Sequence, residues 1–180
     1  FCDEVYRELE YDPANRLPAA CDANPKAVSL GVMSKTYGLA GLRIGWIATH
    51  QKEVLQRIAA LKDYTTICNS APSEFLSEVA LRHREQLAGR NLQIIGKNLG
   101  LLDEFFERHA GLFEWIRPKA GPIAFPKLLK GDIDVFCDEL VNESGVLLLP
   151  GSMYDHPGNH FRIGFARKNM PEALAQLDKF

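Results

Sequence analysis

A lysine and an arginine stand on either side of a glycine-containing loop between two apolar segments. Lys35 follows the apolar residues 28–33, and Arg43 lies near the start of a second apolar run, residues 42–48. A lysine at the end of a strand can be held in a half-buried pocket, where desolvation lowers the pKa of its amine and makes it nucleophilic. The arginine offers a fork of N–H donors that suits a phosphate. The spacing predicts an amine nucleophile beside a phosphate anchor.

Other side chains near the same strand ends could complete such a site. Asp3 and Tyr6 lie at the end of an N-terminal strand, and ligands of open α/β sheets bind beyond the carboxyl ends of the strands. An amine and a phosphate anchor are what an enzyme needs to hold pyridoxal phosphate (PLP) as a Schiff base. An aspartate would keep the pyridine nitrogen protonated, a tyrosine hydroxyl would stabilise the ring oxygen, and Ser34 with Arg43 would hold the phosphate. Plainer roles stay open: a surface Lys35, a turn-capping Asp3, a core Tyr6 and a loop-capping Ser34.

Arg162 is a second candidate anchor. Its neighbours Phe161, Ile163 and Phe165 are apolar, so its charge needs a partner. That partner is either a structural carboxylate or the α-carboxylate of a substrate, which a guanidinium binds bidentately. The residues alone leave both open.

Composition excludes several classes of function. The 180 residues carry a formal net charge of -2, which gives no general attraction to nucleic acid or to an anionic membrane. No apolar run approaches the roughly 20 residues of a membrane span. The four cysteines include no C-x-x-C pair, so we expect reduced cysteines in a cytoplasmic protein. His156 and His160 lie around a Pro-Gly turn, and we expect no metal site there.

The periodicity of the chain predicts an α/β protein with strands at residues 28–33 and 42–49, paired antiparallel or at an edge. Residues 11–15 predict a turn, and helices are expected at 51–64, 72–81 and 86–110, the last weakened by three glycines. After Gly111, short strands are expected at 113–117, 123–125, 146–149 and 161–166, with helices at 133–144, closed by Gly145, and at 171–179. A boundary near residue 88 would separate a domain of residues 1–88 from a strand-rich domain of residues 89–180.

Three segments together resemble the class I and II aminotransferases, which are fold-type I PLP-dependent enzymes. Residues 3–6 read D-E-V-Y, and residues 34–46 resemble the lysine segment S-K-x-x-G-L-x-G-x-R-x-G-W. Residues 150–154, followed by 161–163, resemble the segment P-G-S-x-F…R-I. The matches occur in the family's order but cover only its C-terminal half.

The resemblance implies a role for each matching position. Lys35 would be the Schiff-base lysine, Asp3 the partner of the pyridine nitrogen and Tyr6 that of the ring oxygen. Ser34 and Arg43 would bind the phosphate, and Arg162 the substrate carboxylate. Val32 is a departure, since family members often have a serine there as a further phosphate ligand.

The family fold implies that residues 1–88 are the end of the sheet of a large cofactor-binding domain and that residues 89–180 are a small α+β domain. It also implies a homodimer with sites at the interface. The N-terminal half of the large domain normally supplies other walls of the site, so the 180 residues alone are expected to be inactive.

The implied activity is amino transfer between an amino acid and a 2-oxo acid. Alternatives on the same scaffold are a PLP-dependent lyase, decarboxylase, synthase or cyclase, and Arg162 weighs against a decarboxylase. Residues 64–73 contain no arginine for a second carboxylate, which weighs against dicarboxylic substrates. A cofactor-free relic that serves dimerisation or ligand binding is the non-enzymatic alternative.

Overall fold

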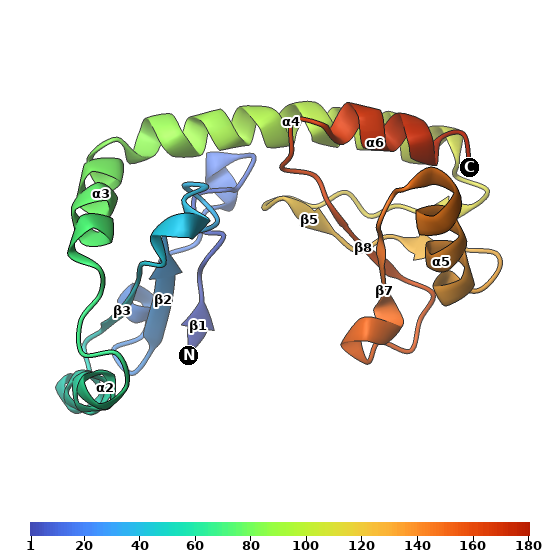
Figure 1. The fold of residues 1–180 in the computed structure, drawn as a ribbon. Helices are drawn as coiled ribbons and strands as arrows, with labels where there is room; N and C mark the ends of the chain where they lie inside the picture. The colour runs from blue at the N-terminus through green and yellow to red at the C-terminus, as the bar shows by residue number, and fades with distance from the viewer. The chain divides into compact units, whose positions relative to one another are not determined.

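A computed structural model describes residues 1–180, which form two compact units, Phe1–Asn91 and Leu92–Phe180. The elements of each unit are labelled in Figure 1. The boundary lies inside helix α4 (Arg84–Arg108), a few residues beyond the predicted position 88. The assignment of the units to a cofactor-binding domain and a small domain stays a prediction.

The first unit contains a three-stranded sheet in the order β1-β2-β3, formed by β1 (Cys2–Asp3), β2 (Val28–Val32) and β3 (Gly45–Thr49). β1 runs parallel to β2, with Asp3 opposite Leu30. β3 pairs antiparallel with β2, which confirms the predicted pairing. β3 begins at Gly45 and not at residue 42, because residues 40–42 form a 3-10 turn, η2 (Ala40–Leu42).

The helices of the first unit follow recognisable end signals. α3 (Ala71–Arg82) has Pro72 and Glu74 in its first turn, as predicted. The predicted turn at residues 11–15 is the 3-10 helix η1 (Pro13–Asn15), where the Asp12 carboxylate accepts a hydrogen bond from the amide of Ala14. The other helices are α1 (Ala20–Ala23), which the sequence analysis missed, and α2 (Lys52–Thr65).

The core of the first unit is small. Met33, Tyr37 and Ala80 are buried together. The partly buried side chains of Leu39, Ile44 and Leu87 pack against them. α3 therefore covers the loop that follows β2, where Lys35 lies.

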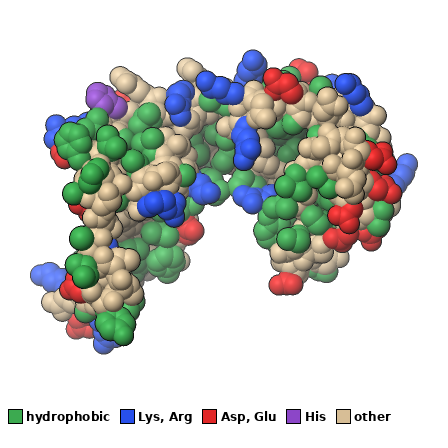
Figure 2. Space-filling view, viewed as in Figure 1, with side chains coloured by type: hydrophobic (Ala, Val, Ile, Leu, Met, Phe, Trp, Pro, Cys, Tyr) green, Lys and Arg blue, Asp and Glu red, His purple; other side chains and the backbone are tan.

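The apolar spacing of α2 and α3 predicted helices correctly, but most of the apolar side chains are not buried within the unit. α2 has no buried residue, and in α3 only Ser77 and Ala80 are buried. Phe75 is 65% exposed and Leu76 is 50% exposed. Figure 2 shows hydrophobic side chains on the surface over these helices. Spacing identifies the apolar face of a helix, but it does not specify what covers that face.

The second unit holds two small sheets. A pair is formed by β4 (Phe113–Glu114) and β6 (Lys127–Leu128), and a three-stranded sheet runs in the order β5-β8-β7. The strands of the latter are β5 (Ile123–Ala124), β8 (Phe161–Gly164) and β7 (Leu149–Pro150). The predicted strand at residues 146–149 is wrong in position, because only its last residue is in β7. Pro150 belongs to β7 because an edge strand tolerates a residue without an N–H donor.

The helices of the second unit match the predicted ones closely. α5 (Ile133–Ser144) begins at Asp132, whose carboxylate accepts hydrogen bonds from two amides of the first turn, and ends at Gly145 in the left-handed conformation. α6 is Met170–Leu177, and the 3-10 helix η3 is Gly151–Tyr154. α4 continues without a break through its three glycines, so no interruption forms there.

An aromatic cluster forms the core of the second unit. Phe105 and Phe106 of α4 pack edge-to-face, with ring centres 5.2 Å apart, and both contact Phe113. Phe113 in turn contacts Phe161 of β8. The buried Asn98 side chain donates two 2.8 Å hydrogen bonds to carbonyl groups that follow β8, which fixes this strand against α4. No helix of the structure is both long enough and apolar enough to cross a membrane.

Candidate active site

Asp3 and Lys35 lie at the carboxyl ends of two adjacent parallel strands. β1 ends at Asp3, and Lys35 lies three residues after the end of β2. Parallel strands present their carboxyl ends at one edge of a sheet, where ligands of α/β proteins bind. The pairing of β1 with β2 therefore brings these two predicted residues to the same edge of the sheet.

Lys35 lies next to Tyr6. Its Nζ atom is 6.0 Å from the centre of the Tyr6 ring, and the Tyr6 side chain is half-buried. Lys35 itself is exposed, so the 180 residues alone do not form the half-buried pocket that a lysine at a strand end can occupy.

The carboxylate of Asp3 also has a structural contact. Its Oδ1 accepts a 3.1 Å hydrogen bond from the amide of Val5, and the side chain is exposed. This is the turn-capping role that the sequence analysis left open. It fixes the aspartate at the end of β1 and is compatible with a further partner, because a carboxylate has about four acceptor positions.

Thr36 was not singled out from the sequence, yet it joins the loop after β1 to the loop after β2, which carry the candidate residues. Its buried hydroxyl lies 2.6 Å from the carbonyl oxygen of Arg7 and 3.2 Å from that of Val5, and it donates its hydrogen to them. Its own carbonyl accepts a 2.8 Å hydrogen bond from the Asn91 side chain. The loop that carries Lys35 is thereby attached to the loop that carries Tyr6. A threonine next to the lysine was the only signal in the sequence.

Ser34 and Arg43 line one shallow pocket. It has a volume of about 130 Å³, and its other lining residues are Val32, Ile44 and Gly45. Arg43 adopts a left-handed backbone conformation with φ of 56°, and its Nη1 donates a 3.0 Å hydrogen bond to the carbonyl of Ala40. A hydroxyl and an exposed guanidinium around one pocket are suitable donors for a phosphate.

Val32 lies at the same pocket, so the departure noted in the sequence has a definite place. Its apolar side chain occupies the wall where a serine hydroxyl would add a donor. The donors on the pocket side chains are therefore those of Ser34 and Arg43. The residues present fit a phosphate with these two side chains.

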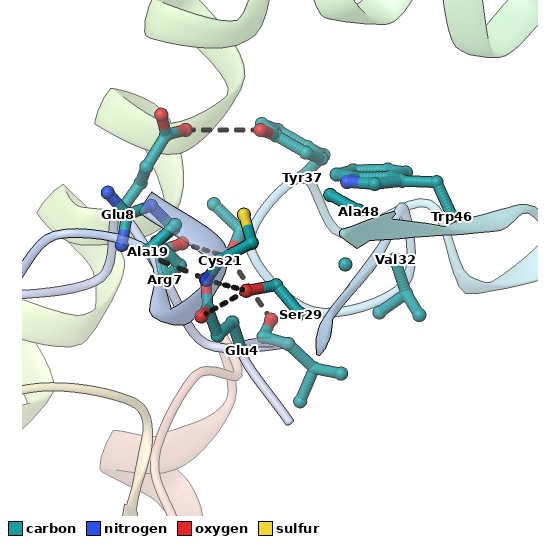
Figure 3. Close-up of a pocket in the computed structure, with 13 residues that line it drawn as sticks. Glu4, Arg7, Glu8, Ala19, Cys21, Ser29, Val32, Tyr37, Trp46 and Ala48 are labelled. Carbon is teal, nitrogen blue, oxygen red and sulfur yellow. Dashed lines mark hydrogen bonds and ion pairs between the residues drawn. The ribbon is translucent and has the colours of Figure 1, made fainter. Parts of the chain in front are cut away.

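A larger cavity of about 220 Å³ lies on the face of the sheet that carries Ser29 and Gly31 (Figure 3). The Trp46 indole lies across Gly31, where an added Cβ would come within 2.3 Å of the Trp46 ring. Tyr37 and Glu8 also line this cavity, and the Tyr37 hydroxyl donates a 3.1 Å hydrogen bond to Glu8. Burial, together with the charge of Glu8, raises the pKa of Tyr37 to about 12.

Glu4 is a second half-buried acid of this cavity. Its carboxylate accepts hydrogen bonds of 2.7 Å from the amide of Ala20 and 2.8 Å from the hydroxyl of Ser29. Burial acts to raise the pKa of Glu4, but these hydrogen bonds and the charge of Arg7 outweigh it, so the pKa is lowered. Glu4 therefore carries a negative charge and anchors α1 to β2.

Arg162 lies in β8 of the second unit. Phe161 and Ile163 on either side of it are buried, whereas Arg162 is half-buried, as expected for alternating faces of a strand. The guanidinium therefore lies on the opposite face of the strand from these two apolar side chains. Its Nη1 donates a 3.3 Å hydrogen bond to the hydroxyl of Tyr154.

The two histidines of the loop between β7 and β8 belong to an aromatic group. The His160 ring stacks on Phe125 at 5.2 Å, and the His156 ring meets His160 at 4.6 Å. Burial lowers the pKa of His160, and the neighbouring charges of His156 and Lys127 act in the same direction. No group of three or more His, Cys, Asp or Glu side chains is arranged to hold a metal ion.

Residues 1–177 match the sequence profile of the family described as Aminotransferase class I and II. The chain belongs to the class I and II aminotransferases. This confirms the resemblance found in the sequence, and PLP is the cofactor of this family. The match covers both compact units.

Individual relatives agree with the family and differ in reaction. Capreomycidine synthase from Streptomyces vinaceus is 29% identical to the chain over 98% of the chain and 46% of its own length. A PLP-dependent aminotransferase from Streptococcus suis 89-1591 is 32% identical with a TM-score of 0.89, over 98% of the chain and 46% of its own. The PLP-dependent cyclase OrfR, solved in complex with Au, is 31% identical with a TM-score of 0.87, over 99% and 48%.

The chain spans about half the length of the relatives that it matches. Its mixed α/β fold corresponds to the C-terminal part of a fold-type I enzyme, as the sequence analysis predicted. The roles of the sheet-edge residues in this chain are proposed below.

Proposed function

We propose that the chain is the C-terminal part of a PLP-dependent aminotransferase that moves an amino group between an amino acid and a 2-oxo acid. The observation that carries the proposal is the placement of Lys35 beside Tyr6, at the sheet edge where β1 ends in Asp3. When bound there, PLP would supply an electron sink for the substrate α-carbon.

The side chains of the first unit have distinct tasks in this proposal. Lys35 would hold the cofactor through its amine in the resting enzyme. Its Nζ, released when the substrate amine takes its place, would then act as the general base that moves the α-proton. Asp3 keeps the pyridine nitrogen protonated, and the Tyr6 hydroxyl donates to the ring oxygen. Ser34 and Arg43 bind the phosphate at the pocket that they line.

Arg162 has a separate task, because it recognises the substrate and not the cofactor. Its guanidinium binds the α-carboxylate through two parallel hydrogen bonds, which fixes the direction of the α-carbon. Glu4 and Trp46 have no assigned chemical task, since their contacts are explained by the packing of α1 and β3.

A second copy of the chain is the partner that we propose. The resemblance implies a homodimer, and the exposed apolar side chains of α3 are compatible with a further contact surface. Light scattering of the full-length protein at several concentrations would measure its oligomeric state. A monomer at all concentrations would contradict this part of the proposal.

The central test uses the full-length protein that contains this chain. Purified protein should show the visible absorbance of bound PLP, and Lys35→Ala should lose it. Lys52→Ala is the matched control, because Lys52 is an exposed lysine at the start of α2. Absence of cofactor absorbance in the unmodified protein would favour the cofactor-free relic and overturn the enzymatic proposal.

A cyclase or synthase is a second candidate, because capreomycidine synthase and the cyclase OrfR are among the similar proteins. The two reactions differ in the fate of the amino nitrogen. Amino donors labelled with nitrogen-15 should pass the label to an added 2-oxo acid in an aminotransferase. A cyclase would retain the label in its product and would need no 2-oxo acid.

A further inference from the structure

Tyr154 contacts Arg162, and the proposed function gives Tyr154 no task. The Nη1 of Arg162 donates a 3.3 Å hydrogen bond to the Tyr154 hydroxyl. Tyr154 is the last residue of η3, and Arg162 is in β8. The pairing of β7 with β8 sets Leu149 opposite Arg162, so the start of η3 is fixed close to the arginine.

The backbone of η3 is attached on both sides of Tyr154. The amide of Gly151 donates a 2.6 Å hydrogen bond to the carbonyl of His160, two residues before Arg162. A Cβ at Gly151 would lie 3.0 Å from that carbonyl oxygen, so only glycine allows this close approach. Asp155, which follows η3, adopts the left-handed conformation with φ of 53°, and its amide donates a 3.2 Å hydrogen bond to the carbonyl of Ser152.

The side chains of η3 are attached as well. The Ser152 hydroxyl donates a hydrogen bond to the carboxylate of Asp134, in the first turn of α5. The Tyr154 ring meets Phe125 edge-to-face at 6.3 Å, and Phe125 stacks on His160. The Tyr154 ring is therefore held by its contact with Phe125, although the side chain is 47% exposed.

We propose that Tyr154 is a positioning residue for Arg162, which sets the plane of the guanidinium for a substrate carboxylate. A guanidinium binds a carboxylate bidentately only when its plane is directed at the two oxygens, and a fixed acceptor on one N–H restricts that plane. The family segment that residues 150–154 resemble has phenylalanine at this position, which offers no such acceptor. The inference rests on the proposed role of Arg162.

The test measures carboxylate binding without any reaction. Titration calorimetry on the full-length holoenzyme would use propionate, pentanoate and 3-phenylpropionate, with propionamide as the uncharged control. Tyr154→Phe should weaken carboxylate binding on the order of five-fold, since it removes one hydrogen bond to a charged group. Arg162→Lys should weaken it further, and the double variant should bind no more weakly than Arg162→Lys alone. Arg57→Lys, at an exposed arginine of α2, should change nothing.

The outcomes separate this inference from the proposed function. Unchanged binding in Tyr154→Phe, or additive losses in the double variant, would overturn the positioning role. Carboxylates that fail to bind, or that bind equally well to Arg162→Lys, would overturn both the positioning role and the assignment of Arg162. Binding that follows the expected order, in an enzyme that releases no 2-oxo acid from any amino donor, would uphold the inference and reject amino transfer.

Discussion

The hydroxyl of Thr36 donates a 2.6 Å hydrogen bond to the carbonyl oxygen of Arg7. This contact joins the loop after β2 to the loop after β1, so the backbone next to Lys35 is fixed relative to the backbone next to Tyr6. In a site built from two loops, such a contact determines whether the functional side chains keep their separation.

Thr36→Val should therefore destabilise the protein and loosen the site. The change keeps the shape of the side chain but leaves two carbonyl groups without a donor, at a cost of about 1–2 kcal/mol in the free energy of unfolding. Urea unfolding of the full-length protein measures this cost. Thr65→Val, at an exposed threonine of α2, is the control and should stay within about 0.5 kcal/mol. Equal effects of the two changes would show that the Thr36 contact has no special weight.

Arg43→Lys should weaken cofactor retention. An ammonium keeps the charge but cannot reproduce the fork of a guanidinium, so we expect the dissociation constant of PLP to rise on the order of ten-fold. Equilibrium dialysis of the full-length protein measures it, with Arg57→Lys at an exposed site of α2 as the control. An unchanged dissociation constant would mean that the phosphate is bound elsewhere.

Two glycine substitutions should have opposite signs. Gly31→Ala places a Cβ within 2.3 Å of the Trp46 ring and should cost about 2 kcal/mol in the free energy of unfolding. Gly89 lies within α4, and a Cβ there would meet no atom within 4 Å beyond the adjoining helix backbone, so Gly89→Ala should stabilise the protein by about 0.5–1 kcal/mol. Thermal unfolding compares the two variants. A neutral Gly31→Ala would show that the indole can move aside at little cost.

Glu4 should contribute a stability that depends on pH. Its folded-state pKa lies below its ordinary value of 4.5, so its contribution is fully present above 4.5 and is lost as the pH falls through the folded pKa. The difference in unfolding free energy between the unmodified protein and Glu4→Gln should be largest at neutral pH and should shrink below 4.5. Glu53→Gln, at an exposed site of α2, should show no such trend. A difference that stays constant with pH would refute the assignment.

The sequence predicted the parts of the fold that local rules determine. Proline and glutamate at the start of α3 and glycine after α5 are end signals, and they lie where the helix ends were expected. β6, with two residues, has no periodicity to detect, and β7 includes Pro150 because it is an edge strand. The formation of such short strands depends on the strands that pair with them, and their own residues do not predict it.

For the candidate site, the sequence predicted which residues lie at the strand ends but not which side-chain contacts they make. Strand ends predicted that Asp3 and Lys35 would share a sheet edge, and the parallel pairing of β1 with β2 agrees with this. Thr36 and Tyr154 were missed because their importance depends on which carbonyl or guanidinium lies opposite them. Spacing alone left open whether Lys35 is half-buried or on the surface, and in the structure its side chain is exposed.

The position of α4 has a consequence for anyone who would express the two halves separately. The boundary between the compact units falls between Asn91 and Leu92, within continuous helical hydrogen bonding. A cut there would expose up to four carbonyl and four amide groups at new helix ends. It would also part Asn91, which binds the Thr36 carbonyl, from Asn98, which binds the segment after β8. A workable division would therefore give each half its own copy of the whole helix.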